Sequence, residues 1–398
     1  MRICFLNPWF EPYPGGIERR LLMVATGLAA RGHEVHVVCA LLAGTAPEER
    51  MHGFQVTRLP TVFFGRYRPP FAFTGVRRLR EAIQRIDPDV VDLHYRWAPD
   101  YTAAALLERR KRPCVLTYHN GHGEGAGWMR PLSQINDRLL DVFIRRFSAV
   151  VVVSEYVRAD LERRSRGLRP TTIYNGVMLR SHELPANSLH EDYLLSVGRL
   201  VPTKGLRELI AAIAICRDEL GISDMRLRIV GLGPEFQRLQ RQTARLGLGD
   251  HVDFLGYVPD SEKDVLMAGC RIFCMPSHRE SFGMAATEAM TLRRPIVACA
   301  AEGLPEAVGR GGILVPPRSP RELAGALAFL WNDETARRSH GAAGFAHARQ
   351  FSWDRAVSET ERLFEEVCAP RSTSSRLSLR RVRRGRLAGS RQAPSPEH

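Results

Sequence analysis

The chain of 398 residues lacks several features that mark common classes of protein. No apolar run is long enough to span a bilayer, and the apolar start at residues 1–6 turns polar too soon for a signal peptide. The eight cysteines are scattered through apolar segments, without the second pair and nearby histidines that a metal site needs. We therefore expect a cytoplasmic protein with reduced, buried cysteines and no metal site.

Acidic residues are also scarce relative to basic ones. The formal net charge is +14, and the eight arginines and one glutamate of residues 371–398 supply half of it. The composition of this tail, without apolar periodicity, predicts disorder over 370–398. Its charge would attract anionic lipid headgroups or nucleic acid. Because no aromatic-and-basic nucleic-acid motif is found, we favour an anionic membrane surface and expect no nucleic-acid partner.

What the chain does contain is strand–helix alternation in two successive halves. The first half, residues 1–183, opens with a strand, a glycine-bearing loop and a helix. A polar linker over 184–191 precedes a second half over 192–352, and a final helix over 353–369 is expected to pack back on the first half. This pattern predicts two Rossmann-like, doubly wound parallel sheets that face each other across a cleft, the usual place for a ligand.

Several shorter segments carry predictions of their own. Residues 61–73 are aromatic, basic and proline-rich, and we expect a surface segment there. The acidic triplet at 87–89 could bind a metal and nucleotide, but its proline and the strand after it favour a plain turn. We expect three helices over 103–110, 137–147 and 264–268.

The most informative stretch is residues 278–290. It reads as a strand end, a tight turn and the start of a helix, bracketed by Glu280 and Glu288. If the helix begins near Ser281, Glu288 lies about two turns further on the same face. Backbone N–H groups at the helix start could hold a phosphate, and the two carboxylates could hold hydroxyl groups. Taken alone, the same residues also suit an ordinary structural junction.

Several short motifs, each weak alone, become specific through their joint order and spacing. They are Pro14-Gly15-Gly16-Ile17-Glu18, Thr117-Tyr118-His119, Asn175-Gly176-Val177, Ser196-Val197-Gly198-Arg199 with Lys204-Gly205, Val230-Gly231-Leu232-Gly233, Phe254-Leu255-Gly256, and Glu280-Ser281-Phe282-Gly283 with Glu288-Ala289. Over residues 1 to about 367, the chain resembles the retaining glycosyltransferase family 4, which has the two-domain GT-B architecture. The resemblance implies an enzyme that uses a nucleotide sugar.

The resemblance also implies roles for individual residues. His119 and Glu280 would contact the donor sugar, while Arg199 and Lys204 would neutralise its diphosphate, which makes these four the catalytic candidates. The remaining donor-binding candidates are Gly15, Gly16, Gly198, Gly233, Tyr257, Val258, Ser281, Phe282, Gly283 and Glu288. The usual mechanism of the family lets the leaving diphosphate oxygen accept the acceptor's proton. It needs no covalent nucleophile, cofactor or catalytic metal.

Three positions depart from the family pattern. Arg293 stands where a glycine usually precedes the next strand, Glu302-Gly303 replaces a glycine pair, and Met178 replaces a frequent acidic residue. The resulting hypothesis is transfer of a hexosyl group from a UDP- or GDP-linked sugar to a hydroxyl acceptor. A lipid-linked or polysaccharide precursor at the inner face of the cell membrane would suit the basic surface.

Two other functions stay open from the sequence. One is a related sugar-nucleotide epimerase, which the pairing of Glu280 and Glu288 with Gly15-Gly16 disfavours. The other is a basic protein that binds nucleic acid or a membrane surface without catalysis. The sequence leaves open the donor base, the sugar, the acceptor and the oligomeric state.

Overall fold

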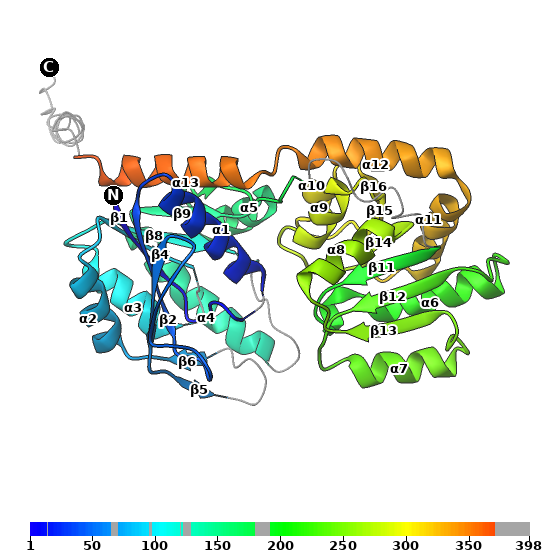
Figure 1. The fold of residues 1–398 in the computed structure, drawn as a ribbon, viewed down its shortest axis with the longest axis horizontal. Coiled ribbons are helices and arrows are strands. Elements are labelled where there is room, and N and C mark those ends of the chain that lie inside the picture. Colours follow the sequence, from blue (N-terminus) through cyan, green and yellow to red (C-terminus); the bar gives the residue numbers. More distant parts are fainter. Residues whose placement is uncertain are drawn as a thin grey trace, which may run out of the picture.

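A computed structural model describes residues 1–13, 15–64, 71–94, 98–119, 121, 129–179 and 192–370. Within these ranges the chain forms two α/β domains side by side, each built on a sheet with helices packed around it (Figure 1). The predicted linker at 184–191 lies outside the described residues, as does the predicted tail beyond Pro370. The doubly wound two-domain fold predicted from the sequence is confirmed.

The first domain contains an eight-stranded sheet in the order β10-β9-β8-β7-β1-β2-β4-β3. The strands are β1 (Arg2–Leu6), β2 (Glu34–Ala40), β3 (Glu48–Met51), β4 (Phe54–Leu59), β7 (Val90–Leu93), β8 (Cys114–Tyr118), β9 (Ala149–Val152) and β10 (Thr171–Thr172). The helical elements are α1 (Gly16–Ala30), α2 (Val76–Ile86), α3 (Pro99–Glu108), α4 (Met129–Phe143), η1 (Ile144–Arg146) and α5 (Glu155–Arg164). All neighbouring strands are parallel except β3, which pairs antiparallel with β4.

The second domain contains a six-stranded, wholly parallel sheet in the order β13-β12-β11-β14-β15-β16. The strands are β11 (Tyr193–Val197), β12 (Arg226–Val230), β13 (Val252–Gly256), β14 (Ile272–Met275), β15 (Ile296–Cys299) and β16 (Gly312–Val315). The helical elements are η2 (Pro202–Lys204), α6 (Leu206–Asp218), α7 (Phe236–Arg245), α8 (Asp260–Gly269), α9 (Met284–Thr291), α10 (Leu304–Val308), α11 (Pro320–Asn332) and α12 (Glu334–Ala348). Every residue of β14 is buried, as expected for a strand covered on both faces.

The last helix, α13 (Trp353–Cys368), crosses from the second domain to lie along the first (Figure 1). Phe364 is fully buried in the core of the first domain, with its ring centroid 6.1 Å from that of Phe5 in β1. Gly27 of α1 allows a close approach, because a Cβ atom there would lie 2.5 Å from Cγ2 of Val357. The apolar face of α13 is therefore part of the first domain's core.

The strand order places one topological switch point in each domain. In the first, the chain leaves β1 toward β2 and later returns to pair β7 on the other side of β1. In the second, β11 is flanked in the same way by β12 and β14. Loops that follow neighbouring strands diverge at such a point and leave a crevice at their carboxyl ends. The loops after β1, β7, β11 and β14 are thus the ones positioned for ligand binding.

The structure corrects several predicted elements. The segment at 61–73, predicted only as a surface segment, contains two short strands, β5 (Val62–Phe64) and β6 (Phe71–Phe73), which pair antiparallel. Helix α3 starts four residues early because a proline suits the first helical position. Helices α4 and α8 also begin well before the predicted residues 137 and 264. Strand β3 escaped prediction because its edge position leaves three of four residues exposed, without an apolar alternation.

Other expectations agree with the structure. The turn at 87–89 is a plain one, in which Asp87 ends α2 and an Asp89 carboxylate oxygen accepts a 2.7 Å hydrogen bond from the Arg2 amide. Seven of the eight cysteines are buried, and burial raises the pKa of Cys4 to about 12, which keeps that thiol protonated at neutral pH. Across the described part of the chain, every helix is too short or too polar to cross a membrane.

Candidate functional site

The junction between β14 and α9 forms the centre of the candidate site. We predicted a helix from Ser281, but α9 begins at Met284, because Gly283 holds the preceding cap position with a left-handed φ of 105°. Glu288 therefore lies one turn beyond Met284, and its predicted position beneath Ser281 was wrong. Ser281 lies in the connecting loop, so the N–H groups of the first helical turn start near Gly283 and Met284.

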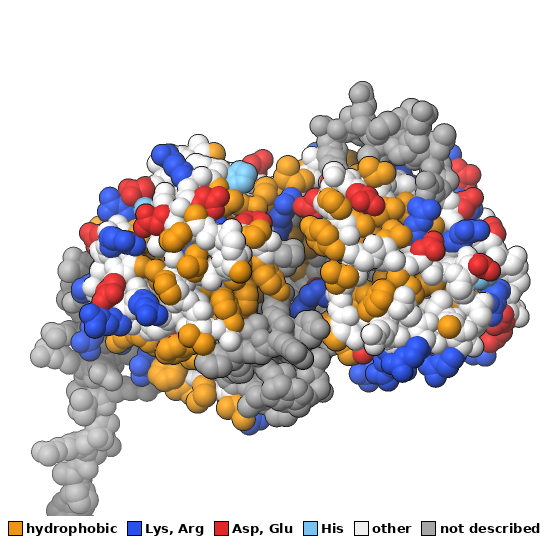
Figure 2. All heavy atoms as spheres, turned by 60° about the horizontal axis from the view of Figure 1, so that its bottom comes forward, with side chains coloured by type: hydrophobic (Ala, Val, Ile, Leu, Met, Phe, Trp, Pro, Cys, Tyr) orange, Lys and Arg blue, Asp and Glu red, His pale blue; other side chains and the backbone are white. Residues whose placement is uncertain are grey.

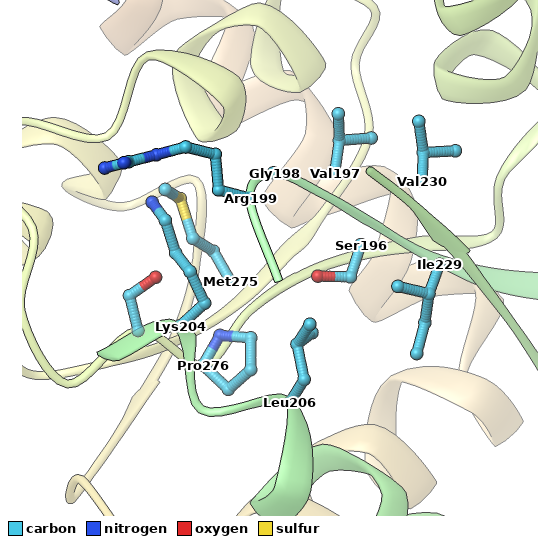
Figure 3. A pocket seen from close by; sticks show the side chains of 11 residues that line it. Ser196, Val197, Gly198, Arg199, Lys204, Leu206, Ile229, Val230, Met275 and Pro276 are labelled. Carbon is cyan, nitrogen blue, oxygen red and sulfur yellow. The ribbon is translucent and has the colours of Figure 1, made fainter. Parts of the chain in front are cut away.

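Two cationic side chains stand beside Glu280. Lys204 of η2 forms a salt bridge with the Glu280 carboxylate, and both side chains are about one-fifth exposed (21% and 19%). Arg199, just after β11, is exposed. In Figure 3 the charged ends of Arg199 and Lys204 lie on the same side of the pocket, with Met275 beside Lys204. Both side chains line one small pocket, together with residues at the ends of β11 and β12 and the segment that follows β14. Three predicted residues thus combine two positive charges with a carboxylate at the second switch point.

Glu288 is linked to the first domain through a series of charged contacts. Lys263 Nζ of α8 lies 3.4 Å from Glu288 Oε2 and 3.1 Å from Asp260 Oδ1. The other Asp260 oxygen lies 3.6 Å from Arg19 Nη1 of α1. Lys263, Asp260 and Arg19 were not predicted from the sequence, because opposite charges spaced by three residues at a helix start are ordinary surface features.

The first domain meets the 281–284 loop at two places. A Cβ atom on Gly16, at the start of α1, would lie 3.5 Å from the Met284 sulfur. The Gly121 amide donates a 3.2 Å hydrogen bond to Ser281 Oγ. The structure therefore brings the Gly15–Gly16 loop and the segment after β8 against the loop that carries Glu280. Figure 2 shows the two halves of the molecule meeting at a groove with Lys or Arg side chains in it.

His119 follows β8 and is only 7% exposed. Its Nε2 atom lies 3.2 Å from Nδ1 of His94, which follows the neighbouring strand β7. His94 Nε2 in turn lies 3.1 Å from Asp92 Oδ2, and the Thr117 hydroxyl donates to both Asp92 oxygens at 3.0 and 2.9 Å. We missed Asp92 and His94 because both lie in an apolar strand run. A signal was present: a histidine at the carboxyl end of a parallel strand that neighbours β8.

An apolar joint holds the domains together behind the cleft. Phe282 is 2% exposed and packs with Val177, Ala307 and Phe351. Its ring centroid lies 5.1 Å from that of Phe351 in an edge-to-face arrangement and 5.9 Å from that of Tyr174. We predicted that Phe282 contacts a donor, but its side chain is buried in the joint. It therefore anchors the loop between β14 and α9, and only its backbone is available at the cleft.

Glu306 of α10 is the polar counterpart of this joint. Its oxygens lie 2.9 and 3.0 Å from the amide nitrogen of Glu155, the first residue of α5, which donates to them. The Tyr174 hydroxyl donates to the same carboxylate at 2.5 Å. Burial, together with this carboxylate, raises the pKa of Tyr174. A side chain of the second domain thus binds the N-terminus of a first-domain helix, which favours negative charge.

The remaining predicted donor-binding residues lie in the loops after β11, β12 and β13. The Gly198 amide donates to Val230 O at 3.0 Å, which joins the ends of β11 and β12. A Cβ atom on Gly233 would lie 2.3 Å from Leu200 O, so a glycine there is required by loop packing. After β13, Tyr257 is 67% exposed, whereas Val258 is 9% exposed. Tyr257 can present its ring to a ligand, while Val258 packs into the core of its domain.

The two departures from family glycines keep a backbone conformation that glycine adopts easily. Arg293 has φ 56° and Glu302 has φ 50°, both in the left-handed region. The Arg293 guanidinium lies over the Phe345 ring at 4.5 Å, and Glu302 accepts a 2.9 Å hydrogen bond from Arg279 Nε. The substitutions therefore change the side-chain contacts at these turns while the turns remain. Among the residues with described positions, no three His, Cys, Asp or Glu side chains gather as a metal ion would require.

Two family models match consecutive parts of the chain. The model described as Glycosyltransferase Family 4 matches residues 14–180, and the model described as Glycosyl transferases group 1 matches residues 182–347. Phosphatidyl-myo-inositol mannosyltransferase of Mycobacterium leprae is 29% identical over 388 residues, which are 92% of this chain and 97% of that protein. D-inositol 3-phosphate glycosyltransferase of Corynebacterium glutamicum is 36% identical over 188 residues, which are 46% of this chain and 45% of that protein.

Solved structures show the same fold. Sucrose-phosphate synthase of Thermosynechococcus elongatus superposes with a TM-score of 0.79 at 21% identity, over 92% of this chain and 98% of that one. HepE of Anabaena, in complex with UDP and glucose, gives a TM-score of 0.72 at 23% identity, over 92% and 100% of the two chains. The matched models, the GT-B fold and the charged residues at its second switch point agree, and the chain belongs to glycosyltransferase family 4.

Proposed function

We propose that the protein transfers a hexosyl group, with retention of anomeric configuration, from a UDP- or GDP-linked sugar to a hydroxyl acceptor. The observation that carries this proposal is the grouping of Arg199, Lys204 and Glu280 beside the N-terminus of α9. A diphosphate needs positive charge and N–H donors, and the two cations and the first helical turn supply both. Glu280 then has carboxylate oxygens to accept hydrogen bonds from sugar hydroxyls.

In this scheme the catalytic groups act by placement and charge. The Lys204 ammonium, paired with Glu280, would stabilise negative charge on the leaving oxygen. The leaving oxygen takes the proton of the acceptor hydroxyl, which attacks the same face of the sugar. No covalent nucleophile, metal or cofactor has a step in this mechanism. Glu288 would bind the ribose hydroxyls, with Lys263 beside it.

The names of relatives support both the proposed nucleotide-sugar donor and the proposed lipid-linked acceptor. HepE of Anabaena has been solved in complex with UDP-glucose, and the mycobacterial relative is named for mannosyl transfer to phosphatidyl-myo-inositol. A nucleotide sugar as donor and a lipid-linked acceptor are therefore consistent choices for this chain. Such an acceptor would require the enzyme to work at a membrane surface.

Helix α4 carries a surface suited to that location. Ile135, Leu139, Val142 and Phe143 are 53%, 59%, 67% and 36% exposed, and their spacing places them on one helical face. Arg138, Arg145 and Arg146 are exposed beside that face. Helix α4 lies in the lower half of the first domain in Figure 1 and runs toward the second domain. Apolar insertion flanked by arginines matches an anionic bilayer, so we propose a cytoplasmic enzyme bound peripherally to the membrane.

The donor is tested with a panel of UDP- and GDP-sugars. Thermal shifts identify which nucleotide sugar binds, and release of nucleoside diphosphate with candidate acceptors then measures transfer. Glu280→Gln and Lys204→Met should each lower kcat by about 100-fold or more, while Arg238→Met on the exposed face of α7 should leave it unchanged. Full transfer by Glu280→Gln would overturn the assigned role, and an inverted product anomer would overturn retention.

Membrane binding is tested by sedimentation with vesicles that contain anionic lipid. The double variant Leu139→Glu/Val142→Glu should lose binding, because it places two carboxylates on the apolar face of α4. The matched variant Arg238→Glu/Arg241→Glu makes a larger change in charge on the second domain and should still sediment. If the α7 variant loses binding and the α4 variant keeps it, basic charge alone accounts for attachment.

A further inference from the structure

We propose that His94 is a positioning residue for His119, and that the buried carboxylate of Asp92 determines which nitrogen of each imidazole carries the proton. The three side chains and Thr117 form a continuous hydrogen-bonded row at the carboxyl ends of β7 and β8. What His119 then does to a sugar rests on the proposed glycosyl transfer, but the protonation pattern does not.

The row is buried along its whole length. Asp92, His94, Thr117 and His119 are between 2% and 7% exposed. A buried carboxylate is unfavourable unless it is hydrogen-bonded or paired with positive charge. Asp92 meets this condition through the Thr117 hydroxyl and His94, and the fully buried Arg20 guanidinium adds electrostatic attraction. Both oxygens of the carboxylate therefore have partners within the buried row.

The direction of each hydrogen bond follows from that charge. An ionised carboxylate only accepts, so His94 Nε2 must carry the proton that points at Asp92 Oδ2. In neutral His94 the other nitrogen, Nδ1, then has a lone pair and accepts from His119 Nε2, 3.2 Å away. Neutral His119 therefore carries its proton on Nε2, and its Nδ1 atom acts as a hydrogen-bond acceptor.

This pattern has a chemical consequence at the cleft. His119 leads into the segment whose Gly121 amide contacts Ser281, beside Glu280. An acceptor nitrogen at His119 binds a hydroxyl hydrogen of a sugar and cannot donate to a phosphate oxygen. The negative charge of Asp92 polarises both rings, which makes that nitrogen more electron-rich. It would stabilise positive charge that develops on the donor sugar during transfer, when the bond to the diphosphate breaks.

The protonation pattern can be measured without any substrate. In protein labelled with ¹⁵N-histidine, ring nitrogen shifts distinguish protonated from unprotonated nitrogens, and the spectra of His94→Asn and His119→Asn assign the signals. We expect the ring proton of His94 and of His119 on Nε2. Asp92→Asn presents an amide that can donate to His94 Nε2 and should change the protonated nitrogen in both rings. A proton on Nδ1 of His119 in the native protein would contradict the proposed row.

Kinetics test the consequence for transfer. Asp92→Asn and His94→Phe should lower kcat by about 10- to 100-fold, as loss of a residue that orients a functional imidazole commonly does, with a smaller change in KM. His94→Phe keeps a ring against Phe5, whose centroid lies 5.4 Å from that of His94. His94→Asn places a carbonyl oxygen near the former Nδ1 position and should recover part of the rate. Equal kcat in all three variants and the native enzyme would refute a positioning role.

A donor lacking one hydroxyl makes the test specific to His119. With a set of monodeoxy donors, Asp92→Asn should lower kcat for every analogue except one. That analogue lacks the hydroxyl from which His119 accepts a hydrogen bond, so the substitution causes almost no further loss of kcat. Unchanged loss with every analogue would exclude this contact. Glu361→Gln is the control, since it breaks another histidine–carboxylate contact, 2.7 Å long, on α13 and should leave kcat unchanged. If no nucleotide sugar is turned over, the proposed function fails, while the nitrogen spectra still decide the protonation.

Discussion

Replacement of Glu306 by alanine should open the two domains. This carboxylate binds the Glu155 amide at the start of α5 and the Tyr174 hydroxyl, both in the first domain. A hydrogen bond to a charged group contributes about 1.5–3 kcal/mol, so two such bonds stabilise the observed arrangement by about 3 kcal/mol at the lower limit. Loss of that amount would shift an equilibrium between closed and open domains about 150-fold toward the open form.

Small-angle X-ray scattering of the protein without ligand measures this change. Glu306→Ala should increase the radius of gyration, and the Michaelis constant for the donor should rise, because the cleft must close on it. Glu306→Gln keeps an acceptor oxygen without the charge and should fall between the native protein and Glu306→Ala. Glu322→Ala removes an exposed carboxylate of α11 and serves as the control. Identical scattering and identical donor affinity for Glu306→Ala and the native protein would refute the reasoning.

Three further predictions concern stability. Gly283→Ala should destabilise the protein by about 2 kcal/mol or more, because φ is 105° and the new Cβ would lie 2.8 Å from Leu304 Cδ2; the matched Gly325→Ala, in open space on α11, should stabilise it by about 0.5–1 kcal/mol in denaturant unfolding. Arg293→Gly should raise the melting temperature slightly by relieving a φ of 56°. Hydrogen bonds from His33 and Arg31 lower the pKa of Glu361, so its contribution is complete above its usual value of 4.5 and disappears as the pH falls through the lowered pKa; in Glu361→Gln, acid unfolding should lose this part of its pH dependence.

The fold was largely predictable because parallel strands buried on both faces appear as continuous apolar runs. Strands such as β9 and β14 were recognised in this way, and the glycine-bearing loop after β1 marked a carboxyl end of the first sheet. Edge strand β3 was missed because three of its four residues are exposed. Helix starts were less accurate, since they depend on cap conformations such as the left-handed one of Gly283.

The candidate site was predictable where one loop carries the signal and not where two distant segments meet. Arg199, Lys204 and Glu280 were found as motif residues, and the structure brings them together. Glu306 binds a tyrosine 132 positions away, and this pairing has no local pattern. Asp92 lies in β7 and His94 directly follows it, and because the other residues of that strand are apolar, the sequence suggested only a core strand. Long-range pairing of polar residues is the part that the sequence conceals.

The replaced glycines show how this chain supports its donor loop. A left-handed conformation costs an ordinary residue about 1–2 kcal/mol, yet Glu302 adopts it at φ 50°. In return its carboxylate binds Arg279, the residue before Glu280, at 2.9 Å. The next amide, of Gly303, donates to the Glu280 carbonyl oxygen at 2.9 Å. These two contacts hold the chain on either side of the Glu280 side chain. A glycine at 302 would lower the conformational energy of the turn, but it would remove the carboxylate that binds Arg279 and so restrain the loop less. The unfavourable backbone at Glu302 is therefore compensated by positioning of Glu280.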